Sequence, residues 1–374
     1  MTALTTTTCE VCSKIDPALP HTVNAERAGV SEATVRRHRK HYGQDTDPFF
    51  TDIPEGIITS RGKSVRLADG SWEKITYSPG KKALLDSLDY DDLERAIAGF
   101  DFKPSSGPVR RYGSELCLAD VQVGKAGQRG GGTPETLAIV QRAYGGYIEH
   151  LQEAGRPEVT VLADLGDPIE NMWNTPSQPF TNDLDLTAQI RVFRRLALEG
   201  LKQLLPHSNR LVYVAVPSNH GAVRTGPKAQ AGTTDADFGL EIFEQLRDVC
   251  ADHKVLSDVE FVRSEPLEET AVVREVGTVV AHAHGHRSGG VFKHGTWWQG
   301  QDHGRRPGWD ADIAAFGHFH TPAKYMSGNG RTVVAAGSVD PGSDWFTNGC
   351  GESAPAVMSW FDFKDGQLIR DGLV

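Results

Sequence analysis

The sequence has few cysteines and no long apolar run. Its 374 residues include five cysteines, and an odd, small number in a chain of this length does not support a disulfide framework. No run approaches the ~20 apolar residues that cross a membrane. The opening MTALTTTTCE lacks the basic segment and apolar core of a secretory signal. The sequence therefore predicts a cytoplasmic protein without a membrane segment.

Positive charge is also scarce. The chain has 39 lysines and arginines against 49 acidic residues, a net charge of -10. Segment 21–41 is the exception, because it contains five lysines and arginines and only two acidic residues. An acidic body does not attract nucleic acid by bulk charge, so nucleic-acid binding would need a basic appendage or bound cations.

Two regions precede the main body of the chain: a short basic front segment, 1–45, and a connector, 46–112. Alternating residues around Asp69-Gly70 in SVRLADGSWEKITY predict a β-hairpin in the connector. Leucines at helical spacing predict a helix over 81–100. The following KPSSGPVRR is typical of a linker.

From residue 113 to the end, short apolar runs each close in polar residues. The runs are SELCLADVQ, VTVLADLGD, LVYVAVPSNH, TVVAHAHGH, ADIAAFGHFH and TVVAAGSVD. Runs of this length predict strands that are buried on both faces. Amphipathic patterns over 134–155 and 181–205 separate the first three runs and predict helices. This alternation predicts an α/β domain over 113–374.

The polar residues at these strand ends share one chemistry, since most of them can bind metal ions. They are Asp120 and Gln122, Asp164 and Asp167, Asn219 and His220, His282, His284 and His286, and His318 and His320. Sites in α/β sheets form at the carboxyl ends of strands. A buried cluster of carboxylates and imidazoles is costly unless cations neutralise it. These donors suit manganese, iron or zinc, and their number suits two divalent ions.

Five motifs, in this order, resemble those of calcineurin-like metallophosphoesterases. ADVQVGK resembles Asp-x-His, with Gln122 where histidine is usual. GDPIEN resembles Gly-Asp-x-x-Asp with Glu170 as its second acid, and SNHG resembles Asn-His-Asp/Glu with Gly221 in place of the acid. HGH at 284–286 and GHFH at 317–320 complete the series, and AAGSVDPGS resembles the family's strand that ends in Gly-Ser.

The resemblance spans about 115–345 and implies a β-sandwich flanked by helices. It also implies ligands for two divalent ions, with manganese favoured over iron and zinc. One ion is assigned to Asp120, Asp167 and His320, with Gln122 as a further candidate ligand. The other is assigned to Asp167, Asn219, His284 and His318, so that Asp167 bridges the two. His284 is favoured over His282 and His286 because Gly-His follows it. His220 is implied to stabilise the transition state or protonate the leaving oxygen.

The roles assigned to His318 and His320 predict the backbone conformation around them. On a regular strand, side chains at i and i+2 point to the same face. The resemblance assigns these two imidazoles to different ions, so the backbone is expected to leave strand geometry after Gly317.

The basic front segment has a pattern of its own. VNAERAGVSEATVRRHRKH resembles a helix-turn-helix signature, with Ala25, Gly29 and Val35 spaced +4 and +6 and Ser31 placed to cap the second helix. That helix would present Arg36, Arg37 and Lys40 to the major groove of DNA. The same fold also serves as a protein-interaction or structural module. Nearby, Cys9 and Cys12 could form a zinc site with His38 and His41, but the spacing is unusual and free thiols are the favoured interpretation.

These parts together predict a metal-dependent phosphodiesterase, and most specifically a DNA nuclease targeted by its front module. ADVQVGK also resembles the first motif of the superfamily's double-strand-break-repair nucleases. One alternative is a phosphatase or phosphodiesterase that acts on a small molecule or phosphoprotein. The other is a DNA-binding regulator with an inactive metallophosphoesterase-like body.

Overall fold

A computed structural model describes the chain in two units, 1–58 and 59–374. The described residues are 25–27, 29–31, 61–66, 72–77, 100, 102–126, 132–174, 181–227, 229–328, 330–340 and 354–374. The backbone alone is described at 61–66 and 72–77. The expected partition into 1–45, 46–112 and 113–374 stays a prediction.

In the first unit, residues 25–27 are helical and the chain turns at Gly29, whose φ is +66°. The N–H of Val30 donates to the Ala25 carbonyl at 3.0 Å, which closes the turn. Ala25 is buried, and the helix-turn-helix module stays a prediction. The remainder of that prediction lies outside the described residues, namely Val35, Arg36, Arg37, Lys40, Cys9, Cys12, His38 and His41.

The predicted hairpin is confirmed. Strand β1 (Arg61–Arg66) pairs antiparallel with β2 (Trp72–Tyr77). Nearly all of the helix expected over 81–100 lies outside the described residues. Of the linker expected over 103–111, residues 103–109 contain no helix or strand, whereas Arg110 and Arg111 begin strand β3 (Arg110–Leu118). The N–H of Ser105 donates to the Pro206 carbonyl at 2.8 Å.

The second unit contains two large sheets. The six-stranded sheet has the order β15-β14-β3-β4-β5-β8. Four of its strands run parallel: β3 (Arg110–Leu118), β4 (Pro157–Asp164), β5 (Leu211–Ala215) and β8 (Glu260–Arg263). At one edge it continues antiparallel through β14 (Ser359–Lys364) and β15 (Gln367–Leu373).

The five-stranded sheet has the order β12-β13-β11-β10-β9. Its parallel centre is β10 (Thr278–Ala283), β11 (Ile313–Phe316) and β13 (Thr332–Ala335). Its antiparallel edges are β9 (Thr270–Glu275) and β12 (Ala323–Met326). A separate small ribbon pairs β6 (Arg224–Gly226) with β7 (Ala229–Gln230).

Helices cover the outer faces of both sheets. The long ones are α5 (Thr133–Ala154), α6 (Leu186–Leu204), α7 (Phe238–Ala251) and α8 (His294–His303). Short 3₁₀ turns are η3 (Leu205–His207), η4 (Leu256–Asp258) and η5 (Val291–Lys293). The predicted helices over 134–155 and 181–205 are therefore confirmed as α5 and α6. No helix in the described part of the chain is long and apolar enough to span a membrane.

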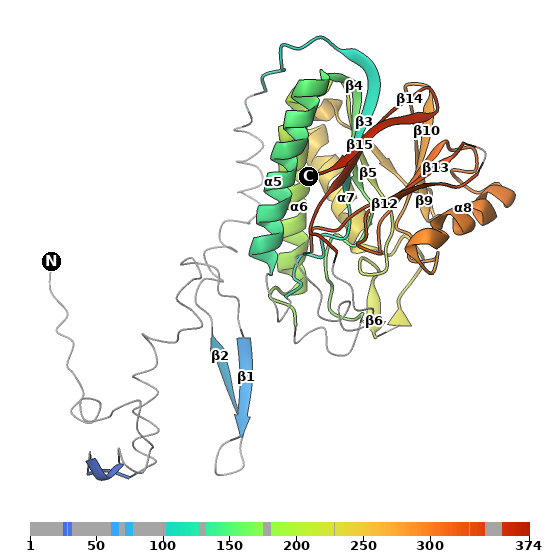
Figure 1. Cartoon of the computed structure of the whole chain (residues 1–374). Coiled ribbons are helices and arrows are strands. Elements are labelled where there is room, and N and C mark those ends of the chain that lie inside the picture. The colour runs from blue at the N-terminus through green and yellow to red at the C-terminus, as the bar shows by residue number, and fades with distance from the viewer. Residues whose placement is uncertain are drawn as a thin grey trace, which may run out of the picture. The chain divides into compact units, whose positions relative to one another are not determined.

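Side-chain alternation along the strands builds the layers. On β3, Leu116 and Leu118 pack in the cluster under α5, α6 and α7, whereas Cys117 packs between the two sheets. On β11, Ala314 and Phe316 pack toward α8, while its other buried residues face the first sheet. The result is an α/β/β/α sandwich, with helices on either side of two facing sheets (Figure 1). This confirms the expected fold, a β-sandwich flanked by helices.

Candidate metal centre

The expected site residues leave their strands through an unusual backbone conformation. The φ angle is positive at Asp120 (50°), Gln122 (45°), Asp167 (52°), His318 (75°) and His320 (55°). Non-glycine residues seldom adopt this region, and such strain gathers at functional sites. Because β11 ends at Phe316, the prediction that the chain leaves strand geometry near the two histidines is confirmed.

Two glycines let these loops approach one another. Gly166 has a φ of +91°, and a Cβ there would lie 2.8 Å from His284 Nδ1 and 2.6 Å from the Ser218 Cβ. A Cβ on Gly317 would lie 2.8 Å from Asp120 Oδ2. Both positions therefore require glycine if the strand ends of the two sheets are to meet.

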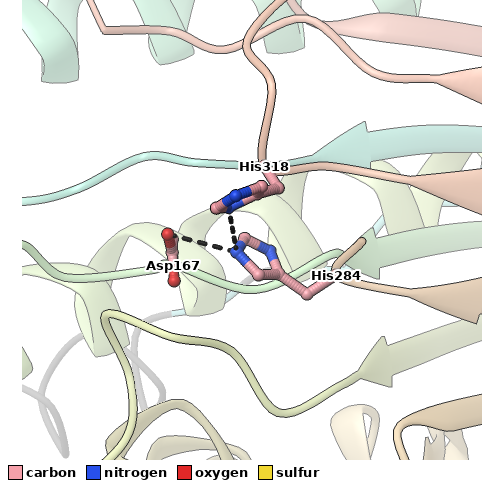
Figure 2. Close-up of side chains that lie close together, drawn as sticks. All are labelled: Asp167, His284 and His318. Carbon is pink, nitrogen blue, oxygen red and sulfur yellow. Dashed lines mark hydrogen bonds and ion pairs between the residues drawn. The ribbon is translucent and has the colours of Figure 1, made fainter. Parts of the chain in front are cut away.

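Three side chains from both sheets converge at this edge (Figure 2). Asp167, His284 and His318 each offer one donor atom, and these atoms lie within 4.8 Å of one another. His284 Nε2 lies 3.2 Å from Asp167 Oδ2 and 3.2 Å from His318 Nδ1. Asn219 adds a fourth group, since its Oδ1 lies 2.9 Å from the same His284 nitrogen.

The groups around His284 favour a positive charge at its Nε2. Its Nδ1 lies 2.8 Å from the Leu165 carbonyl, which can only accept, so this nitrogen carries a proton and Nε2 faces the cluster. Such carbonyl contacts orient histidines that bind metals. Burial lowers the pKa of His284, but the Asp167 carboxylate outweighs it and raises the pKa to about 9. A divalent ion can replace that proton.

The carboxylates fit an ion as well. Asp167 Oδ1 accepts the His220 N–H at 2.7 Å, and Asp120 Oδ2 accepts the His318 N–H at 2.7 Å. Their second oxygens, Asp167 Oδ2 and Asp120 Oδ1, are buried and accept no hydrogen bond from the described residues. Asp120 Oδ1 lies 3.5 Å from His320 Nε2. Buried carboxylate oxygens beside imidazole nitrogens are the donor set of manganese, iron and zinc sites.

His220 is held beside the cluster by Glu170. Its Nδ1 lies 3.2 Å from Glu170 Oε2 and 3.1 Å from the Glu170 carbonyl oxygen. Burial lowers the pKa of His220, but the Asp167 and Glu170 carboxylates outweigh it and raise the pKa to about 9. The acid that usually follows the histidine in the motif is thus replaced by one from another strand end.

The structure also explains why position 221 holds glycine and not an acidic residue. A Cβ there would clash with the Asp237 carboxylate. Asp237 accepts the Ser218 N–H at 2.9 Å through Oδ2 and caps α7 by accepting from Gly239 N and Leu240 N. The space beside the motif is therefore already filled by an acid that fixes the loop.

Gln122 has a partner that the sequence reasoning missed. Lys125 Nζ donates to Gln122 Oε1 at 2.6 Å and to Asp340 Oδ2 at 2.6 Å. Asp340 Oδ2 also lies 3.8 Å from His320 Nδ1. Lys125 belongs to the motif ADVQVGK that the sequence analysis identified. Nothing in the sequence, however, indicates that it pairs with Asp340, 215 positions away.

The structure places the three neighbouring histidines differently: His282 lies on β10, and His284 and His286 follow that strand. His282 is buried, with Nε2 3.0 Å from Glu115 Oε2, away from the cluster atoms of His284. His286 lies at the rim, with Nε2 3.8 Å from Glu269 Oε2 and its ring 5.4 Å from that of His284. Only His284 of the three belongs to the close cluster of described donors.

Comparisons with known proteins find distant likenesses to solved structures. No family model matches the sequence, and no curated protein does. An uncharacterised protein of Streptococcus pneumoniae, described as a predicted phosphoesterase, is 11% identical over 67% of this chain and 83% of that one, with a TM-score of 0.28. Vacuolar protein sorting 29 of Cryptosporidium parvum is 10% identical over 70% and 97%, with a TM-score of 0.33. Zinc-complexed Vps29 of Entamoeba histolytica is 12% identical over 70% and 98%, with a TM-score of 0.29. Because these identities and TM-scores are low, the fold is assigned from the sheet topology of the chain itself.

Proposed function

We propose that the protein is a metal-dependent phosphoesterase of the calcineurin-like type that hydrolyses phosphodiester bonds. The observation that carries the proposal is the buried cluster of Asp167, His284 and His318, with the Asn219 oxygen beside it and His220 next to it. A divalent ion bound there supplies a Lewis acid and an activated water. Manganese is the proposed metal, with iron and zinc as alternatives.

His220 is proposed as the general acid. The Asp167 and Glu170 carboxylates raise the pKa of His220 to about 9, which favours the protonated imidazole that a general acid needs. Glu170 engages the proton on Nδ1, which leaves Nε2 as the nitrogen that donates to the leaving oxygen. A positioned acid of this kind contributes about 10²–10⁴-fold to the rate.

DNA is the proposed substrate, and the front segment 1–45 is proposed as the module that binds it. The support comes from the basic side chains of Arg36, Arg37 and Lys40 and from the likeness of ADVQVGK to repair nucleases. Bound cations at the centre would offset the repulsion between an acidic body and a phosphate backbone.

The test is hydrolysis of bis-p-nitrophenyl phosphate by metal-free protein reloaded separately with manganese, iron and zinc. We expect Asp167→Ala to abolish activity and His220→Ala to lower kcat by about 10²-fold or more. His303→Ala, an exposed histidine at the end of α8, is the matched control and should keep full activity. Full activity in Asp167→Ala would place the reaction elsewhere.

A substrate panel separates the proposed nuclease from the other interpretations. Single- and double-stranded DNA are compared with cyclic nucleotides and phosphopeptides, each with the metal that supports the model reaction. Preference for DNA supports the nuclease. Preference for a small molecule or phosphopeptide replaces it, and DNA binding without any hydrolysis identifies a regulator.

A further inference from the structure

A positive charge is already built into one side of the metal centre. The Lys125 ammonium lies 2.6 Å from both Gln122 Oε1 and Asp340 Oδ2. The lysine side chain is 19% exposed and that of Asp340 is 6% exposed, so the pair is shielded from solvent. Asp340 also faces His320 Nδ1, which connects the ammonium to the pair His320 and Asp120.

The two expected ion positions are unequal in their donors. On one side, Asp167, His284 and His318 form a compact triad that the Asn219 oxygen joins. On the other side, Asp120 and His320 approach each other to 3.5 Å, but they join no comparable group of three among the described histidines, cysteines and acids.

Gln122, the remaining expected donor on that side, already accepts from Lys125. A divalent ion on the same amide oxygen would be held next to an ammonium, and like charges at such separations repel strongly inside a protein. An uncharged amide does little to offset that repulsion. An imidazole at position 122 would be a better ligand than this amide, but the chain has Gln.

We propose that the protein binds one divalent ion, at Asp167, His284 and His318, and that Lys125 supplies the second positive charge in place of a second ion. This inference rests on the proposed function and revises the two-ion expectation from the sequence. Lys125 acts through its charge: its ammonium balances Asp340 and Asp120 and favours a phosphate oxygen at that side of the site. Unlike a metal ion, it cannot acidify a water molecule.

The experiment counts bound ions directly. Full-length metal-free protein is dialysed against manganese, the bound metal is measured by mass spectrometry, and its electron paramagnetic resonance spectrum is recorded. We expect one ion per chain, with the spectrum of an isolated ion, in the wild type and in the control Lys324→Ala, whose lysine pairs with Asp371 away from the site. The double variant Gln122→His/Lys125→Ala should bind two ions with a spin-coupled spectrum.

The outcomes separate this inference from the proposed function. No ion in the wild type after dialysis against manganese, and then against iron or zinc in its place, would overturn both the metal centre and the phosphoesterase. Two ions of similar affinity in the wild type would overturn the lysine proposal alone, and the phosphoesterase would stand. One ion in the double variant, folded as judged by circular dichroism, would also overturn the role of Lys125.

Discussion

At the residue scale, the partner of His220 shows how the chain departs from its motif and compensates. The sequence places Gly221 where an acid is usual, and Asp237 leaves no room for a side chain there. Glu170, from the loop after β4, instead reaches His220 Nδ1. The longer glutamate in GDPIEN therefore has a use that a motif comparison did not assign to it.

Replacing Glu170 by glutamine should move the alkaline limit of activity. The charge of Glu170 helps to raise the pKa of His220, so its removal lowers that pKa and the imidazole loses its proton at a lower pH. A metal ion bound to Asp167 would neutralise much of its charge. Glu170 would then be the main group that raises the pKa of His220. We expect the alkaline limb of the kcat profile to shift down by about one pH unit. The control Glu153→Gln, on the exposed face of α5, should leave the profile unchanged, and an unshifted profile in Glu170→Gln would remove Glu170 from this role.

At the element scale, the strands that end in polar residues were predictable because each is a short apolar run. Helices α5 and α6 were predictable from their 3.6-residue period. The C-terminal hairpin of β14 and β15 was missed, although Asp365-Gly366, with φ angles of 49° and 78°, is the same turn signal that indicated the β1–β2 hairpin. The contacts of Lys125 with Asp340 could not be predicted, because sheet packing alone brings residues so distant in sequence together.

The strand-end loops depend on Gly166, and its replacement by alanine should damage the metal centre from outside it. Alanine at a φ of +91° is strained, and its Cβ would press on His284 Nδ1. We expect a loss of about 1–3 kcal/mol in the free energy of unfolding and a drop of about 10-fold in metal affinity. Chemical denaturation and metal titration measure the two effects. Gly145→Ala, exposed in α5 with nothing near its added Cβ, should be neutral or stabilising, and equal effects of the two substitutions would contradict this account.

At the scale of the whole molecule, the candidate metal ligands come from both sheets, and neither sheet contains the full set. The first sheet brings Asp120, Asp167 and Asn219, and the second brings His284 and His318, so these oxygen donors and these two imidazoles come from opposite layers. Their meeting depends on both sheets ending at the same edge. The sequence predicted candidate donors and their order, whereas the unequal surroundings of the two expected ion positions became visible only in the folded chain.

Deletion of residues 1–45 tests whether the front segment serves the rest of the molecule by binding DNA. The residues of the proposed metal centre lie within the second unit, 59–374, so kcat/KM on bis-p-nitrophenyl phosphate should stay unchanged. DNA affinity should fall, and so should its dependence on salt, because each phosphate contact that a basic side chain makes contributes about 0.9 to the slope of log affinity against log salt. The substitution of Arg36, Arg37 and Lys40 by alanine should lower that slope by about 2 to 3, whereas Arg247→Ala, in the second unit, should not. Fluorescence anisotropy over a salt series measures the slopes. A slope that stays unchanged after both the deletion and the triple substitution would mean that the contacts with DNA phosphates lie within residues 46–374.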